Sequence, residues 1–287
     1  MSNPESVARG HLYVVATPIG NLADLSPRAA AVLAGVDLIL AEDTRNSWVL
    51  MQHAGITTPM AALHDHNERG LAESLIQRLE AGEALALISD AGTPLISDPG
   101  FVLVRQVRDA GLPVMTVPGP CALIAALSIA GLPTDRFTFV GFLPAKTSAR
   151  RSALAPLGAL TETWVCYESS HRIADTLADM EAVLGADRDV LLARELTKRF
   201  EQSVRLPLGA LRAWLAEDPM HEKGEFVLCV AGAAAASDAD RQLTEGRRLM
   251  ARLVQELPAS RAARIAAELS GAPRKQLYVE SLAEPDA

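Results

Sequence analysis

Cysteine is scarce in this 287-residue sequence, and its spacing argues against a small stapled domain. The three cysteines, Cys121, Cys166 and Cys229, are far apart and form no CxxC pair. Neither a disulfide framework nor a zinc knuckle is supported, which favours a reducing compartment. The first ten residues are polar, and no apolar run approaches the length of a membrane span. We therefore expect a soluble cytoplasmic protein without a membrane partner.

Aromatic residues and net positive charge are also lacking. Aromatics make up 4 % of the chain, so stacking of nucleobases along a groove is not expected to dominate. The formal net charge is −8, so any contact with nucleic acid needs a local basic patch. No GxGxxG, Walker or GxSxG motif is present. His64-Asp65-His66 lacks further ligands at a useful spacing, so we expect no metal ion.

Strand and helix patterns alternate through the first 120 residues. One helix is predicted to begin at Ser26-Pro27, with serine as the cap and proline at the first helical position. Another is predicted near residues 69–81. Such alternation is typical of a parallel sheet covered by helices, so residues 1–120 are predicted to form a parallel α/β domain. The predicted strands cover residues 12–16, 36–41, 84–88 and 114–117.

Residues 121–232 carry a different pattern, in which several strands alternate in polarity. This alternation suits an antiparallel or mixed sheet with one solvated face, so we predict a second α/β domain here. The Ala-rich run over residues 231–237 is interpreted as a linker. The predicted strands cover residues 137–141, 163–167, 190–193, 201–206 and 226–231.

The last segment, residues 240–287, is basic and helical in pattern. Eight Lys or Arg stand against four acidic residues between positions 241 and 280. Helices are predicted over residues 244–256, 261–269 and 274–282, and the last two resemble a helix-turn-helix. The segment is therefore predicted to be a small helical module. It either helps to capture RNA or only packs as a three-helix unit.

The loop over residues 89–100 is the most informative stretch of the chain. It reads SDAGTPLISDPG and follows the apolar strand 84–88. Ligands of open α/β sheets bind at the carboxyl ends of strands, and glycine lets the backbone approach a ligand closely. Asp90 and Asp98 have no basic neighbour in the loop, so a neutral or cationic ligand is favoured over a phosphate. The alternative is a turn in which an aspartate caps a helix.

Polar segments follow six of the predicted strands. Any one of them could be a capped turn, but six on two sheets predict a cleft between the domains, lined from both sides. The segments are residues 17–21, 42–45, 90–100, 118–122, 167–172 and 194–198.

Several of these segments carry a family resemblance that spans roughly residues 12–232. The chain resembles the tetrapyrrole-methylase superfamily and, within it, the ribosomal small-subunit RNA cytidine 2′-O-methyltransferase family. Cys121 and Ser170 depart from the usual serine and proline of that family. The resemblance rests on ATPIGNL (16–22), AEDTR (41–45), SDAGTPLISDPG (89–100), VPGP (117–120), GFLP (141–144) with Lys146, YES (167–169) with His171-Arg172, RELTK (194–198) with Phe200-Glu201, and KGE (223–225).

The resemblance implies a two-domain class III methyltransferase fold. It implies an enzyme that binds S-adenosylmethionine in the interdomain cleft, acts on 16S ribosomal RNA within the small subunit, and forms a homodimer. A loop with two aspartates suits the cationic sulfonium of this cofactor. The implied cofactor-binding residues are Asp90, Gly92, Thr93, Pro94, Ser97, Asp98, Cys121, Ala122, Tyr167 and Glu225.

Transfer of a methyl group to a ribose hydroxyl needs alignment and a base. The catalytic candidates, unranked, are Glu42, Asp43, Lys146 and Glu195, with His171 as a further base. Each could equally be a structural salt-bridge partner. The expected RNA-binding residues are Arg45, Arg150, Arg151, Arg172 and Lys198. Two other functions stay open: methylation of a tetrapyrrole-like small molecule, and a non-catalytic RNA-binding assembly factor.

Overall fold

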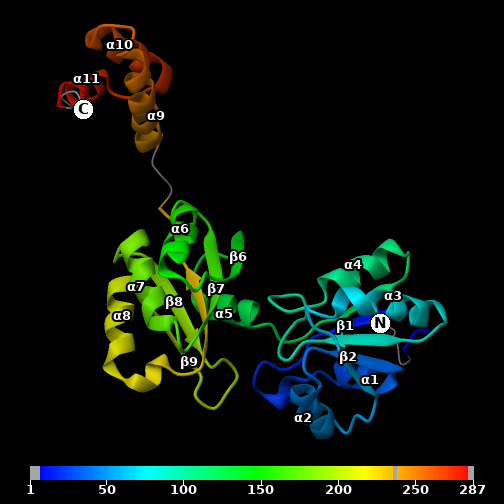
Figure 1. The fold of residues 1–287 in the computed structure, drawn as a ribbon. Helices are drawn as coiled ribbons and strands as arrows, with labels where there is room; N and C mark the ends of the chain where they lie inside the picture. Colours follow the sequence, from blue (N-terminus) through cyan, green and yellow to red (C-terminus); the bar gives the residue numbers. More distant parts are fainter. Residues whose placement is uncertain (1–6, 235–237, 284–287) are drawn as a thin grey trace. The chain divides into compact units, whose positions relative to one another are not determined.

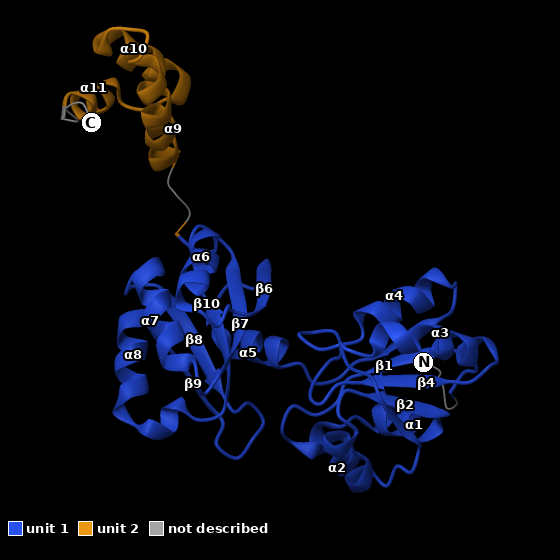
Figure 2. Ribbon diagram, in the orientation of Figure 1, with its two compact units in different colours: residues 1–233 blue, residues 234–287 orange. Residues whose placement is uncertain are grey.

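The structure is a computed structural model that describes residues 7–234 and 238–283. Residues 1–233 form one compact unit and residues 234–287 form a second (Figure 2). The linker predicted over residues 231–237 straddles this division, and its residues 235–237 lie outside the described part of the chain. Two five-stranded sheets make up the first unit, one on either side of residue 120 (Figure 1).

The first sheet is wholly parallel, as predicted, with strand order β3-β2-β4-β1-β5. The short strand β3 and the helix α2 were not predicted. The elements are β1 (Leu12–Val15), η1 (Leu22–Asp24), α1 (Pro27–Gly35), β2 (Leu38–Ala41), α2 (Thr44–Ala54), β3 (Met60–Ala62), α3 (Glu68–Glu80), β4 (Leu85–Ile88), α4 (Phe101–Asp109) and β5 (Val114–Val117).

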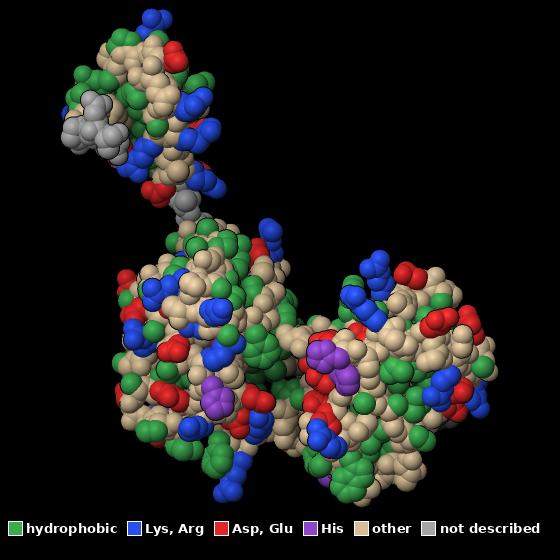
Figure 3. Space-filling model, viewed as in Figure 1, with side chains coloured by type: hydrophobic (Ala, Val, Ile, Leu, Met, Phe, Trp, Pro, Cys, Tyr) green, Lys and Arg blue, Asp and Glu red, His purple; other side chains and the backbone are tan. Residues whose placement is uncertain are grey.

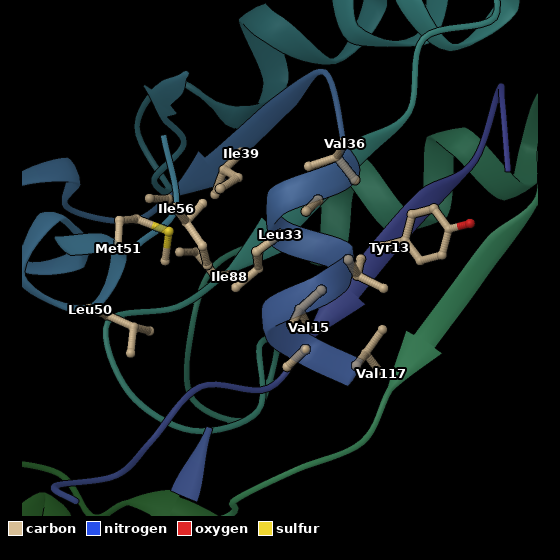
Figure 4. Close-up of a cluster of buried hydrophobic side chains, with 14 of the residues drawn as sticks. Tyr13, Val15, Leu33, Val36, Ile39, Leu50, Met51, Ile56, Ile88 and Val117 are labelled. Carbon is tan, nitrogen blue, oxygen red and sulfur yellow. The ribbon is translucent and has the colours of Figure 1, made fainter. Parts of the chain in front are cut away.

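Helices cover both faces of this sheet. Ser26 caps α1 as predicted, since its side chain accepts the Ala29 N–H at 3.1 Å. Figure 4 shows the resulting core, in which Leu33 of α1 meets Val15 and Ile39 of the strands. Helices α3 and α4 cover the opposite face. The carboxyl ends of the strands, and the loops that follow them, stay available for a site.

The second sheet is mixed, with order β6-β7-β10-β8-β9, and only β6 and β7 run parallel. The strand predictions for this half are confirmed within a few residues. The elements are α5 (Ala122–Ala130), β6 (Phe137–Phe142), α6 (Thr147–Leu157), β7 (Thr163–Ser169), α7 (Ile173–Leu184), β8 (Asp189–Arg194), β9 (Gln202–Pro207), α8 (Leu208–Glu217), η2 (Pro219–Glu222) and β10 (Glu225–Val230).

The expectation that one face of this sheet is solvated is wrong. Helices α6, α7 and α8 cover one face, and α5 covers part of the other. Helix α5 is apolar along most of its length, so it can bury Leu123 and Leu127 against the strands. Ile19, from the loop after β1, packs into the same cluster and ties the first half of the unit to the second.

The second unit consists of α9 (Asp238–Leu253), α10 (Ala259–Ser270) and α11 (Arg274–Ala283). The three predicted helices are present, although α9 begins and ends earlier than predicted. Small side chains at Ala262, Ala263 and Ala266 let the helices pack closely around a core of their own. Gly271 has a φ of 77° and ends α10, as expected for a helix-turn-helix turn.

Candidate active site

A cavity of about 270 Å³ lies between the loops of the two sheets in the first unit. Five of the six predicted strand-end segments contribute to its lining, and the segment 42–45 does not. Its floor is apolar, from side chains such as Ile19, Leu196 and Val227. Its polar groups come from both halves, which is the usual composition of a small-molecule site.

The loop 89–100 forms one wall of the cavity and is held by hydrogen bonds to the strand ends beside it. Thr17 and Gly92 exchange two backbone hydrogen bonds, of 2.8 and 3.1 Å. The Thr93 hydroxyl donates to the Pro120 carbonyl at 3.0 Å. Gly92 has a φ of 85°, and a Cβ there would lie 3.3 Å from Ile19. The wall is therefore rigid before any ligand binds.

Two further residues of this loop adopt the left-handed conformation, Leu95 at φ 72° and Ser97 at φ 69°. Such conformations cost free energy in residues with side chains and cluster at functional sites. They turn the chain so that Ser97 and Asp98 both line the cavity. The strained backbone therefore lies in the part of the loop that lines the cavity.

Asp98 is the aspartate of this loop that faces the cavity. Burial raises its pKa to about 6, and the negative charges of Glu42 and Asp90 add to the effect, while a hydrogen bond with Ser89 opposes it. A carboxyl group with this pKa is ionised at neutral pH yet remains a better proton acceptor than an ordinary aspartate.

Asp90 and Pro94 do not line the cavity. The Asp90 carboxylate accepts the Asp43 N–H at 3.0 Å and the Asn46 side-chain amide at 2.8 Å, so it fixes the start of α2. Pro94 is buried. The other eight predicted cofactor-binding residues do surround the cavity: Gly92, Thr93, Ser97, Asp98, Cys121, Ala122, Tyr167 and Glu225.

Tyr167 joins the second sheet to helix α5 at the cavity wall. Its hydroxyl accepts the Leu123 N–H at 3.1 Å and so satisfies one amide of the first helical turn. Its ring meets Phe139 and Phe142 edge-on, at centroid distances of 4.9 and 5.7 Å. Burial raises the pKa of Tyr167, so the hydroxyl stays protonated and keeps this geometry.

Lys198 crosses the cavity edge between two carboxylates. Its Nζ lies 2.8 Å from Glu195 and 2.7 Å from Glu225. Burial disfavours the charged forms of both Glu195 and Lys198. The hydrogen bonds and opposite charges of the pair together outweigh this effect, so the pKa of Glu195 is lowered and the pKa of Lys198 is raised. Two glycines make room for this pair. A Cβ at Gly20 would clash with Lys198, and a Cβ at Gly224 would clash with Glu195.

The four catalytic candidates lie outside the cavity lining. Asp43 caps α2, and hydrogen bonds from Arg45 lower its pKa to about 2, which makes it a poor base. Glu42 is half-buried after β2, where burial and then Asp90 raise its pKa. Lys146 is exposed at the start of α6, and Glu195 is committed to Lys198.

The expectation that Arg150 contacts RNA is wrong, because its side chain is buried. Its guanidinium pairs with the equally buried Asp179 at 2.6 Å and donates to the Ala145 carbonyl at 3.0 Å. Arg151 is half-exposed and pairs with the same carboxylate. Arg172 pairs with Glu168 beneath the cavity.

Of the remaining predicted RNA-binding residues, Arg45 is exposed but paired with Asp43, and Lys198 is paired as described above. The floor residues Ile19 and Leu196 lie within the predicted cleft segments 17–21 and 194–198, but they were not named as site residues, because the prediction favoured polar side chains. Phe142 was missed as well. It lies at the mouth, and its sequence signal is the segment GFLP (141–144), which is one of those that carry the family resemblance.

Within residues 7–234 and 238–283, no three His, Cys, Asp or Glu side chains are arranged to share a metal ion. None of the described helices combines the length and apolar composition needed to cross a bilayer.

A family model and curated relatives give the same family. Residues 11–212 match the model of the Tetrapyrrole (Corrin/Porphyrin) Methylases, and residues 240–284 match the RsmI C-terminal HTH domain. The chain is 56 % identical over 269 residues to "Ribosomal RNA small subunit methyltransferase I" of Xylella fastidiosa, covering 94 % of this chain and 98 % of that protein. The protein of the same name from Pseudomonas aeruginosa is 52 % identical over 276 residues, covering 96 % and 98 %.

Solved structures agree on the fold. The methyltransferase CobJ superposes with a TM-score of 0.57 at 18 % identity, covering 78 % of this chain and 95 % of that chain. Cobalt precorrin-4 methyltransferase, CbiF, gives a TM-score of 0.55 at 16 % identity, covering 77 % and 94 %. The chain belongs to the tetrapyrrole methylase family and, within it, to the family of the ribosomal RNA small subunit methyltransferase I proteins.

Proposed function

We propose that this protein transfers a methyl group from S-adenosylmethionine to the 2′-oxygen of a cytidine ribose in 16S ribosomal RNA. The observation that carries the proposal is the cavity itself. It lies at the strand ends of both sheets and has an apolar floor and carboxylates at its edge. The near-full-length similarity to proteins named ribosomal RNA small subunit methyltransferase I supports RNA over a tetrapyrrole as substrate.

The residues around the cavity fit this cofactor. Its adenosine and aliphatic parts suit the apolar floor of Ile19, Leu196 and Val227. Its cationic sulfonium suits a site that contains Asp98 and Glu225. The first turn of α5, where Cys121 and Ala122 line the cavity, carries the partial positive charge that favours a carboxylate. We assign cofactor contacts to the eight predicted residues that surround the cavity.

When bound, S-adenosylmethionine supplies an activated methyl group for an in-line displacement. The protein has two tasks, to align the ribose hydroxyl and to accept its proton. Alignment by a rigid site can remove about 7–11 kcal/mol from a barrier, which explains the hydrogen-bonded wall of residues 89–100. We assign the proton to the Asp98 carboxylate, because it faces the cavity and has a pKa of about 6.

RNA would approach over the exposed side of the cavity. We assign phosphate contacts there to Lys146, Arg45 and Arg151, whose charged groups reach the surface. We further infer that the protein works in the cytoplasm as a homodimer on small subunits. Ile124 and Ile129 of α5 are exposed, and large exposed apolar side chains of this kind support a surface that a partner covers.

The test uses purified protein, S-adenosylmethionine with a labelled methyl group, and small subunits that lack the modification. The expected product, after nuclease digestion and mass spectrometry, is 2′-O-methylcytidine from a single site. Naked 16S RNA is tested in parallel and tells whether the assembled subunit is required. Label on a base would refute the 2′-O assignment. Label only on an added tetrapyrrole precursor, or no transfer despite cofactor binding, would support one of the two alternative functions instead.

A further inference from the structure

Strand β6 contains an irregularity just before the cavity. Phe139 pairs with Val165 of β7, but Phe142 pairs with Tyr167, so three residues of β6 oppose two of β7. Gly141 lies inside this bulge with a φ of 65°. A bulge changes which face of a sheet the following side chain occupies, and bulges are frequent beside functional sites.

The bulge determines where Phe142 points. In an unbroken strand Phe142 would share a face with Val140, two residues earlier, and Val140 packs into the core beneath α6, α7 and α8. The extra residue instead brings Phe142 to the face of Phe139 and Tyr167. Both phenylalanines meet the Tyr167 ring edge-on. Because of the bulge, Phe142 lies at the cavity and not in the core beneath α6, α7 and α8.

Phe142 lines the cavity and is nevertheless 55 % exposed. Floor residues such as Ile19 and Val227 are buried, so Phe142 belongs to the mouth. The edge-on contact with Tyr167 positions the Phe142 ring and leaves the ring largely exposed to solvent. A chain with 4 % aromatics therefore presents one of them to solvent at the entrance of its site.

A cation lies four residues further along the same segment. Lys146 is exposed, and its ammonium group has no hydrogen-bond or ion-pair partner among the described residues. The segment beneath it is fixed, because Arg150 donates to the Ala145 carbonyl and Arg172 to the Leu143 carbonyl. An aromatic ring and a cation on one fixed segment suit single-stranded RNA, which can stack a base on the ring and place a phosphate at the cation.

We infer that Phe142 stacks against the base of the RNA nucleotide whose ribose enters the cavity, and that Lys146 contacts a phosphate of the same strand. The inference rests on the proposed function, since it assumes that the substrate is RNA. The exposure of Phe142 favours a base that arrives from solvent over the adenine of the cofactor, which the apolar floor accommodates. The low aromatic content does not oppose such stacking, because one well-placed ring is sufficient.

The test compares Phe142→Ala with Phe142→Trp and with Phe137→Ala in methyl transfer to unmodified small subunits. Phe137 is on the same strand and 39 % exposed, but it does not line the cavity, which makes it a matched control. Loss of one stacked base predicts a fall in kcat/KM of about 5- to 150-fold in Phe142→Ala. Phe142→Trp should retain activity, and Phe137→Ala should match the wild type.

Two binding measurements complete the test. Calorimetry with S-adenosylmethionine should give the same affinity for Phe142→Ala and the wild type. Lys146→Ala should weaken binding of the subunits and reduce its salt dependence. The inference is overturned if Phe142→Ala behaves like Phe137→Ala, or if Phe142→Ala loses cofactor affinity in proportion to activity. A wild type that binds cofactor but methylates no RNA would instead refute the proposed function.

Discussion

The buried pair of Arg150 and Asp179 allows a sharp prediction about stability. Their side chains are 2 % and 4 % exposed, and two nitrogens of Arg150 lie within 2.7 Å of one carboxylate oxygen. Arg150→Met keeps much of the side-chain volume but leaves Asp179 buried without its main partner. Removing one member of a buried pair typically costs about 3–5 kcal/mol. For a unit of this size the cost corresponds to a fall in melting temperature of about 6–20 °C.

Arg151 provides the control, because it binds the other oxygen of the same carboxylate at 2.6 Å but is 52 % exposed. Exposed pairs contribute about 1 kcal/mol or less, so Arg151→Met should have a small effect. Urea denaturation of both variants, followed by circular dichroism, gives the two free energies of unfolding. Equal losses in the two variants would refute the argument that burial makes Arg150 a structural residue. A large loss from Arg151→Met alone would do the same.

Three further perturbations have definite expected outcomes. Asp98→Asn should abolish most methyl transfer and raise the melting temperature at pH 7. Because the pKa of Asp98 is raised to about 6 in the folded protein, ionisation destabilises the fold increasingly as the pH rises from about 4 to 6. The gain in melting temperature over the wild type should therefore shrink as the pH falls through this range, and a constant gain would contradict the shift. Gly224→Ala should destabilise the first unit by about 1–3 kcal/mol in urea, because its Cβ would lie 2.5 Å from Glu195 at a φ of 105°. Gly82→Ala has a similar φ of 89° but open space around it, so it should cost less, and equal costs would refute the clash. Truncation after Ala233 should leave cofactor affinity unchanged in calorimetry, since no described residue of the second unit lines the cavity. It should raise the KM for subunits and flatten its salt dependence, because eight basic residues of α9–α11 are lost (Figure 3). Loss of cofactor affinity on truncation would mean that the second unit only stabilises the first.

Local patterns were sufficient to predict much of the architecture. Ser26-Pro27 indicated the start of α1, and the apolar run before residue 89 indicated β4, because both signals are contained in a few neighbouring residues. The place of the loop 89–100 at the cavity could be predicted for the same reason, since the loop follows a buried parallel strand. The family resemblance added the cofactor, which no local pattern specifies.

Long-range contacts explain the errors. Arg150 looked like an exposed cation because its partner Asp179 is 29 residues away, on another helix. The contacts of Asp90 at the start of α2 could not be predicted either, because its partners are more than forty residues away. The bulge before Phe142 depends on pairing with β7, which no reading of β6 alone can show. In each case the decisive contact joins elements that are distant in sequence.

The most direct test of the central claim is the methylation state of 16S ribosomal RNA in cells that lack this gene. Ribosomal RNA from the deletion strain and from its parent is digested and mapped by mass spectrometry. We predict that one 2′-O-methylcytidine disappears in the deletion strain. It should return with the wild-type gene but not with the Asp98→Asn variant. A deletion strain with fully methylated 16S RNA would contradict the account.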